Sequence, residues 1–423
     1  MSDLELKVRI RQARGKFAAM AGAYSLGVFN DNFFKEVAIY LAIDAGIGEM
    51  RGIAAVMLAL PYVLFAAYCG WLADRFSKRT IVIGAKALEM VAMLCGAAAL
   101  LTGTWWLLLA MVFLMGWQSA IFSPALNGSI PELYPASFVT TANARMKMVT
   151  IAAILLGMVV AGYALDVKGG AGGETAAITT LAKSVAAAAV VAVAAVGLLV
   201  SVGVPKRPAA SPKVAFPWTG PVDTFKQLVH IHKDSLLAKI VWADVFIWSV
   251  GSLQMLIVNR LGMEQLKLTR ATTSSLKFAS LVGIAAGGML AAKLAVGRRW
   301  YRVLVPACFV LSVLVVAVGG IPYLPAGLQA PLLFVLLGLA GVAGGVFMIP
   351  CESFIQVRAA PEEKGAVIAA ANFAIFCGII LSGLLIYALD KVMVPTTFFA
   401  SIALVSVPVA IWLHVALRRE DRA

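Results

Sequence analysis

The chain is poor in charged residues and in histidine. Only 13% of its 423 residues are Asp, Glu, Lys or Arg, and it contains three histidines. Soluble globular domains carry about 25% charged residues, so this composition excludes that class. Hydrophobic residues make up 61% of the sequence. The class that remains is a membrane protein with many spans.

The histidines and cysteines offer little to enzymatic or metal chemistry. None of His230, His232 and His414 is followed five positions later by aspartate, the spacing that phospholipid acyltransferases use. The five cysteines show neither disulfide pairing nor metal-ligand spacing, and we interpret them as small buried hydrophobic residues. We therefore expect no enzymatic activity, no metal site and no cofactor.

Twelve apolar stretches are long enough to cross a bilayer as helices. They lie near residues 17–43, 51–73, 80–101, 105–126, 141–165, 176–204, 235–259, 273–296, 303–320, 329–350, 364–389 and 394–417. An even number of spans places both termini on one side of the membrane. The net charge of +14 comes from lysines and arginines that cluster at the span ends on that side, which predicts cytoplasmic termini and gives no reason to expect a nucleic-acid partner.

A proline-rich stretch at 205–221 interrupts the apolar pattern and is too rich in proline to be helical. It predicts three parts: a six-helix bundle over 1–204, a cytoplasmic central loop with a short surface helix over 205–234, and a second six-helix bundle over 235–423. Apolar and polar residues interleave just after the prolines, as in a helix lying on a membrane surface. A solvated connector is the alternative interpretation of this segment.

The two halves repeat each other. The segment 70–75 returns as 288–293, 218 positions later, and 163–166 returns as 387–390, 224 positions later. Similar segments in the same order at a nearly constant offset indicate duplication of a six-helix unit. The predicted fold is therefore an all-α membrane protein with twelve transmembrane helices in two pseudo-symmetric six-helix bundles.

The first span carries a charged and polar patch near its centre, at Asn30, Asp31, Asn32, Lys35 and Glu36. A charge at hydrocarbon depth costs about 3 kcal/mol on insertion scales, so three cost about 9 kcal/mol, whereas the apolar residues of the span recover about 6 kcal/mol. Asp31 and Lys35 are four residues apart, as are Asn32 and Glu36, so they form neighbouring stripes on the helix. We predict that this span lines a wet cavity.

The second span ends with Gly70, Leu72 and Ala73 and runs into a charged turn with Asp74, Arg75, Lys78 and Arg79. This pattern resembles the signature loop between helices two and three of the major facilitator superfamily. The resemblance implies the fold described above and alternating access, in which the two bundles rock about a midplane site. It also implies a gating network that stabilises the outward-open state and consists of Gly70, Asp74, Arg75, Lys78, Arg79, Glu132 and Arg145.

Further polar residues flank the spans that surround this loop. Lys147 lies near Glu132 and Arg145 between spans four and five, and Glu352 and Arg358 end the tenth span. We expect them to form cytoplasmic ion pairs. Asn143 and Asn372 begin the fifth and eleventh spans, where we expect polar contacts between helices.

Two stretches narrow the resemblance. Residues 29–35, and residues 118–133 at the end of the fourth span, are similar to the bacterial lysophospholipid transporters, especially to the transporter portion of members fused to an acyltransferase. The resemblance implies inward movement of lysophospholipid, chiefly lysophosphatidylethanolamine, across the bacterial inner membrane for reacylation. It implies a monomer in the lipid bilayer, with a separate acyltransferase as a candidate partner. Many members carry a lysine where this chain has Leu126, which affects the headgroup preference.

A headgroup that crosses the bilayer needs polar contacts, while its acyl chain can stay in lipid. Asp31 would receive an ammonium group, and Lys35 would either pair with Asp31 or contact a phosphate. A structural ion pair is the alternative for these two residues, and a contact with a neighbouring helix is the alternative for Gln254. The candidate substrate-binding residues are Asn30, Asp31, Asn32, Phe34, Lys35, Asn127, Trp248 and Gln254.

A second functional hypothesis remains open. Asp31, Glu36 and Asp244 lie within apolar spans and would be able to bind protons, so the chain would also fit a proton-coupled carrier of a small solute or drug. No segment outside the membrane is long enough to support a receptor-like or purely structural role.

Overall fold

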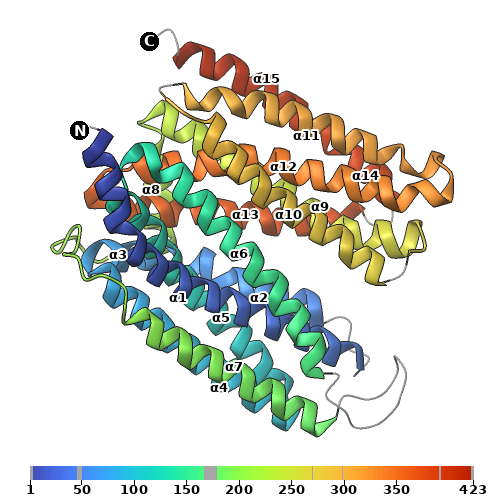
Figure 1. Cartoon of the computed structure of the whole chain (residues 1–423), viewed down its shortest axis with the longest axis horizontal. Coiled ribbons are helices and arrows are strands. Elements are labelled where there is room, and N and C mark those ends of the chain that lie inside the picture. Colours follow the sequence, from blue (N-terminus) through green and yellow to red (C-terminus); the bar gives the residue numbers. More distant parts are fainter. Residues whose placement is uncertain are drawn as a thin grey trace. The chain divides into compact units, whose positions relative to one another are not determined.

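The computed structural model describes residues 3–44, 50–165, 179–268, 270–297, 299–389 and 392–420. All regular secondary structure within these ranges is helical (Figure 1). The α-helices are α1 (Asp3–Asp44), α2 (Met50–Leu64), α3 (Ala66–Arg75), α4 (Lys78–Thr102), α5 (Trp105–Leu133), α6 (Ala136–Leu165), α7 (Thr180–Ser201), α8 (Pro221–Ile231), α9 (Ser235–Arg260), α10 (Arg270–Leu294), α11 (Leu304–Gly319), α12 (Ala326–Arg358), α13 (Lys364–Leu389), α14 (Pro395–Ser401) and α15 (Ala403–Glu420). Asp166 and Asp390, which end the second repeated motif, lie outside the described residues.

The described helices confirm the all-helical membrane class. Ten helical segments are long and apolar enough to span a membrane, and the bent pair α2 and α3 makes an eleventh. The remaining predicted span lies in α1, a 42-residue helix that carries the polar patch. The pair α2 and α3 bends by 58° at Phe65, whose φ of −110° and ψ of 8° are not helical.

The chain divides into two compact units. Unit 1 comprises Met1–Pro135, Val149–Gln227 and Ala359–Phe373, and unit 2 comprises Ala136–Met148, Leu228–Arg358 and Ala374–Ala423. Each unit therefore includes the first part of a helix from the other half of the sequence. The start of α6 packs in unit 2, and the start of α13 packs in unit 1.

Glycines let helices approach closely inside each unit. In unit 1 a side chain at Gly70 would collide with the backbone of Gly365 and Ala366 at the start of α13. In unit 2 the counterpart of Gly70 in the repeat is Gly288. A Cβ atom on Gly288 would lie 3.7 Å from Ala144 at the start of α6. Equivalent glycines thus pack against the start of a helix from the other half in both units, which agrees with the repeat seen in the sequence.

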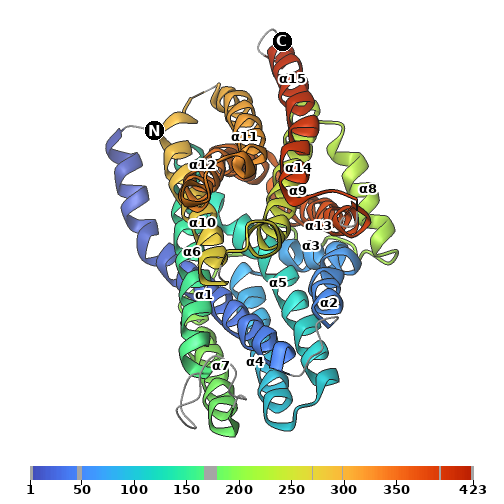
Figure 2. The same ribbon diagram turned by 90° about the vertical axis from the view of Figure 1, so that its right-hand side faces the viewer.

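Small residues also set the packing of α10 against α12, which run closely together (Figure 2). Gly283 and Gly287 of α10 meet the backbone of Gly338 and Val342 on α12, leaving no space for a Cβ atom. Membrane helices have no hydrophobic driving force between them in lipid, so close backbone approach is a main source of their packing energy. These glycines therefore let α10 and α12 pack backbone against backbone in unit 2.

The proline-rich connector contacts α3 on one side, while Lys206, Pro208, Lys213, Trp218 and Thr219 are exposed. The carbonyl oxygen of Val214 accepts hydrogen bonds from Trp71 Nε1 at 3.2 Å and from Arg75 Nη1 at 3.1 Å. The ring of Phe216 lies 5.0 Å from that of Trp71 and 5.5 Å from that of Tyr68. Proline prevents a helix here but leaves carbonyl groups free to accept these bonds. The short helix predicted after the prolines is α8.

Candidate functional site

One face of α1 presents the polar residues of the predicted patch to its neighbours in unit 1. Gly27, Asn30 and Asp31 are spaced i, i+3 and i+4, so they share this face. Asn30 is fully buried, and its Nδ2 donates a hydrogen bond of 2.9 Å to the carbonyl oxygen of Val190 on α7. Asp31 has Ser119 of α5 as a hydrogen-bond partner. Asn30 and Asp31 of the patch therefore face the helix bundle of unit 1.

A buried ion pair that the sequence analysis missed lies against the same face. Lys86 and Glu89 of α4 have side chains only 1% exposed, and Lys86 Nζ lies 2.6 Å from Glu89 Oε2. A Cβ atom on Gly27 would lie 2.8 Å from that Nζ and 3.0 Å from that Oε2. Asp31 experiences the charges of both residues. The lysine that the structure brings to Asp31 is thus Lys86, whereas Lys35 is exposed.

Aromatic rings and glycines surround this ion pair. Lys86 Nζ lies 5.9 Å from the ring centre of Phe122 on α5, and that ring stacks on Tyr24 of α1 at 5.6 Å. A Cβ atom on Gly197 of α7 would lie 3.3 Å from the same nitrogen. The ion pair has space between the helices because Gly27 of α1 and Gly197 of α7, which have no side chain, lie beside Lys86 Nζ.

The other candidate residues of unit 1 have distinct surroundings. Phe34 is fully buried and belongs to a hydrophobic core to which α1, α4, α5, α6 and α7 contribute. Asn32 is half-buried and donates to the carbonyl oxygen of Val28 at 2.8 Å. Asn127 is half-buried and donates to Ser123 Oγ at 3.2 Å. Their part in substrate binding stays a prediction.

The candidate residues of unit 2 lie on α9. Trp248 is half-buried, and Lys147 Nζ of α6 lies 4.9 Å from its ring centre. Lys147 also forms an ion pair of 3.2 Å with Glu352 Oε1 of α12, and both charges act on the buried carboxyl group of Asp244. The sequence predicted ion pairs within each half for these two residues, whereas the structure pairs them with each other, and Lys147 also lies over the ring of the candidate substrate residue Trp248. Gln254 Nε2 is buried and has no hydrogen-bond partner.

The central residue of the predicted gating network is Asp74, at the end of α3. Its Oδ1 accepts the N–H of Gly365 at 2.7 Å and its Oδ2 accepts the N–H of Ala366 at 2.9 Å, both in the first turn of α13. These N–H groups have no partner within their own helix, and the positive end of the helix dipole favours a carboxylate. Asp74 therefore caps a helix from the other half of the sequence, and Gly70 lets the two approach.

The other predicted gating residues make different contacts. Arg75 donates to the connector at Val214, as described above. Lys78 Nζ donates to the carbonyl oxygen of Ala73 at 2.6 Å and lies 3.9 Å from Glu132 Oε1. Arg145 is exposed, with its guanidinium carbon 5.2 Å from the ring centre of Phe138. Arg79 is half-buried.

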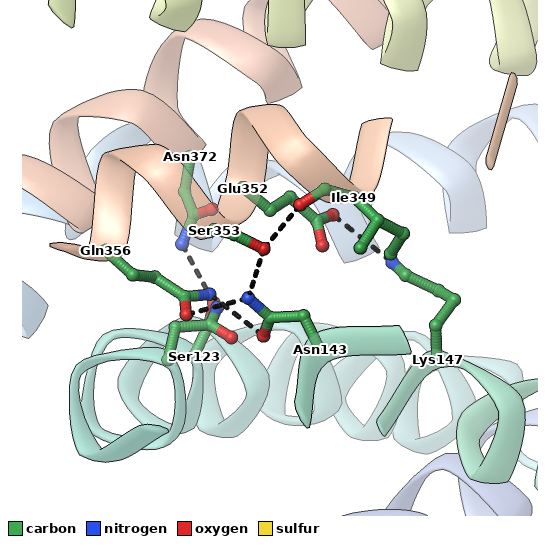
Figure 3. Close-up of polar contacts among 9 residues, drawn as sticks. Ser123, Asn143, Lys147, Ile349, Glu352, Ser353, Gln356 and Asn372 are labelled. Carbon is green, nitrogen blue, oxygen red and sulfur yellow. Dashed lines mark hydrogen bonds and ion pairs between the residues drawn. The ribbon is translucent and has the colours of Figure 1, made fainter. Parts of the chain in front are cut away.

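Asparagines join helices from the two halves of the sequence, as predicted. Asn143 of α6 donates to Ser353 Oγ at 2.9 Å and to Gln356 Oε1 at 3.0 Å, and it accepts from Gln356 Nε2 at 3.3 Å (Figure 3). Asn372 of α13 donates to Ser123 Oγ of α5 at 2.9 Å. Both predicted contacts are thus confirmed, the first in unit 2 and the second in unit 1.

An ion pair at the start of α9 also ties α9 to the end of α12. Asp234 Oδ2 lies 2.5 Å from Arg358 Nε, and Asp234 Oδ1 accepts the N–H of Leu237. Partial burial raises the pKa of Asp234, but the hydrogen bonds from Arg358 and Leu237 outweigh it and leave the pKa below its ordinary value of 3.8. The pair is therefore ionised at neutral pH.

Comparisons with known proteins agree on the family. A family model described as Major Facilitator Superfamily matches residues 17–383. The chain is similar to the lysophospholipid transporter LplT of Cronobacter sakazakii, with 28% identity over 82% of this chain and 81% of the relative. It is also similar to LplT of Salmonella arizonae, with 31% identity over 70% of this chain and 68% of the relative.

Solved structures with a similar fold are more distant in sequence. The human organic anion transporter MFSD10 gives a TM-score of 0.78 at 13% identity, covering 95% of this chain and 99% of that one. The fucose:proton symporter FucP of E. coli gives a TM-score of 0.74 at 13% identity, covering 95% and 98%. At this identity the likeness concerns the fold.

Proposed function

We propose that this chain, which belongs to the Major Facilitator Superfamily, moves lysophospholipid across the bacterial inner membrane by alternating access. Relatives that share about 30% identity over most of the chain are named lysophospholipid transporters. The observation that carries the proposal is the polar cluster at Asp31, Lys86 and Glu89, which is enclosed by a largely apolar helix bundle. Charges at this depth are costly and mark substrate or ion pathways.

The substrate that we propose is lysophosphatidylethanolamine, for reacylation on the cytoplasmic side by a separate acyltransferase. Its ammonium group would approach Asp31, and Asn30, Asn32 and Asn127 would provide neutral hydrogen bonds. Lys35, which is exposed, would be free to contact the phosphate. Phe34 of unit 1 and Trp248 and Gln254 of unit 2 remain candidate substrate residues, each within its own unit. Both termini would be cytoplasmic, because the basic residues cluster at that end of the spans.

The gating contacts give this proposal its mechanism. Asp74 binds α3 to α13, and Asn143 binds α6 to α12. Each contact joins helices from different halves of the sequence near the ends that we expect to be cytoplasmic. Opening towards the cytoplasm would break both contacts, and closing would restore them. The motion thus depends on a few polar contacts at the ends of helices.

Uptake in cells tests the function directly. Cells that lack their own lysophospholipid carrier would express the wild type, Asp31→Ala or the control Arg11→Ala, which changes an exposed residue of the same helix. We expect uptake of labelled lysolipid with the wild type and the control, and loss of uptake with Asp31→Ala at equal expression. No uptake with the wild type would refute the function, and full uptake with Asp31→Ala would remove the binding role of this carboxylate.

A further inference from the structure

A cavity of about 140 Å³ lies in unit 1 between α3, the connector, α8 and the first two turns of α13. Its apolar wall includes the ring of Trp71 and the small side chains of Ala67 and Ala370. A cavity of about 150 Å³ inside a protein holds a molecule the size of benzene. The space therefore suits a small organic molecule.

One polar side chain in the wall of this cavity lacks a hydrogen-bond partner. Thr224 of α8 lines the cavity and is only 2% exposed. Its Oγ1 makes no hydrogen bond within the described part of the chain. Buried hydroxyl groups of this kind are rare, because they lose their hydrogen bonds to water without gaining others. A molecule bound in the cavity would supply the missing hydrogen bond.

The charged residues in the wall are negative. Asp74 of α3 and Asp223 of α8 line the cavity, and none of the described residues in its wall is Lys, Arg or His. The hydrogen bonds that Asp223 accepts from Thr219 keep its pKa below the ordinary value of 3.8, so this carboxylate is ionised at neutral pH. Each oxygen of Asp74 accepts one backbone N–H of α13 and can accept a second bond. The wall therefore favours a cation that donates hydrogen bonds.

The cations near these carboxylates are bound to other groups. Lys226 lies 3.2 Å from Asp223 Oδ1, but its side chain is 67% exposed and is not part of the cavity wall. Lys78 donates to a backbone carbonyl oxygen of α3, and Arg75 donates to that of Val214. None of the three is part of the wall that contains the unpaired hydroxyl group. A cation in the cavity would therefore come from outside the chain.

We propose that this cavity binds a small organic ammonium ion and that the bound ion holds α8 to α3. Its N–H groups would donate to Thr224 Oγ1 and to Asp74, and its short apolar part would lie against Trp71. Since Asp74 also caps α13, the bound ion would favour the state in which this cap is closed. The inference goes beyond the proposed function, because the polar patch of α1 takes no part in it.

Binding of propylammonium to the purified full-length protein tests the site, measured by saturation-transfer NMR. Propan-1-ol and propionate are the neutral and anionic probes of similar size, and we expect propylammonium alone to bind. Thr224→Val should weaken its binding about tenfold, because one hydrogen bond to a charged group is lost. Thr224→Ser keeps the hydroxyl group and should bind like the wild type. The matched control is Thr397→Val, which changes an exposed threonine of α14 and should also bind normally.

The ammonium group would come either from a soluble amine or from a lipid headgroup. Nanodiscs of phosphatidylethanolamine and of phosphatidylcholine separate these sources, because the quaternary ammonium of the second lipid has no N–H to donate. A headgroup in the cavity would compete with propylammonium and weaken its binding in phosphatidylethanolamine only. Equal binding in both lipids would support a soluble amine as the ligand.

Labelling of Cys69 on α3 measures the conformational effect, with the other cysteines replaced. A methanethiosulfonate reagent would be used, because it reacts with thiols and not with amines. A ligand that binds only the closed state, at about ten times its Kd, should slow labelling about tenfold. Unchanged labelling at this concentration would overturn the link to the cap of α13.

Three results of the NMR measurements would overturn the site itself. They are no binding of propylammonium, equal binding of propan-1-ol, and equal affinity of the wild type and Thr224→Val for propylammonium. None of these measurements involves transport, so they stand apart from the uptake experiment that tests the proposed function.

Discussion

Replacing Asn143 by alanine tests whether polar contacts between helix ends set the conformational equilibrium. The substitution removes three hydrogen bonds between α6 and α12, two to Gln356 and one to Ser353. Ser353 keeps its own bond to the carbonyl oxygen of Ile349, whereas both polar atoms of Gln356 lose their partner. We expect α6 and α12 to separate more often in this variant.

The size of the effect follows from the number of bonds. Hydrogen bonds between membrane helices contribute about 0.6 kcal/mol each on average, so three contribute about 2 kcal/mol. A change of 1.4 kcal/mol is a factor of ten in an equilibrium constant. The population of the open contact should therefore rise about 30-fold.

Cys351 provides a native probe of the packing around this part of α12. It lies on α12 beside Glu352 and Ser353, and its side chain is 0% exposed. The other four cysteines would be replaced by alanine, leaving Cys351 to react with a maleimide. When opening is fast compared with labelling, the labelling rate is proportional to the open population. We expect Asn143→Ala to label about 30-fold faster than the parent protein.

A second asparagine supplies the control. Asn372→Ala removes a single hydrogen bond, to Ser123 in unit 1, and should change the labelling of Cys351 less than about threefold. Equal labelling rates in Asn143→Ala and the parent protein, with both folded, would refute the idea that these bonds hold the helices together. A larger effect in Asn372→Ala than in Asn143→Ala would refute the assignment of the contact to α6 and α12.

Two further predictions concern carboxylates outside the polar cluster. Asp74→Asn leaves one amide oxygen for two backbone N–H groups and removes the charge, which costs about 1.5 kcal/mol. With the other cysteines replaced, maleimide labelling of the buried Cys69 on α3 should therefore become about tenfold faster. An unchanged labelling rate would contradict the capping role of Asp74. The lowered pKa of Asp234 means that its pair with Arg358 stabilises the fold above about pH 4 and loses this effect as the pH falls through the lowered pKa. The free energies of thermal unfolding of the wild type and Asp234→Asn should therefore differ by less than about 1 kcal/mol between pH 5 and 8. This difference should become smaller below pH 4. A difference that stays constant down to pH 3 would contradict the assignment of the ion pair.

Several features of the chain could be predicted from its sequence because they depend on local pattern. The length of the apolar stretches predicted the membrane helices, and the repeated segment at Gly70 and Gly288 predicted a duplicated unit, with which the packing of both glycines agrees. Asn143 and Asn372 were recognisable as helix contacts, since an amide at the start of an apolar span has few partners other than a neighbouring helix.

The sequence also contains a signal of the buried ion pair in α4. Lys86 and Glu89 lie three residues apart inside the predicted third span, and the cost of charge at that depth applies to them as it does to Asp31. Applying the same rule to every span would have found them. Their pairing with the face of α1 that carries Gly27 could not be predicted, because it depends on which face each helix turns to its neighbour.

Composition and periodicity by themselves thus determined that this chain is a helical membrane protein with duplicated halves and a polar first span. Tertiary structure decided which charges meet. It brought Lys86 rather than Lys35 to Asp31, placed Asp74 on the first turn of α13, and packed the connector at Val214 against α3. These contacts join residues 55 to 292 positions apart, and a pattern that repeats every few residues carries no information about such distances.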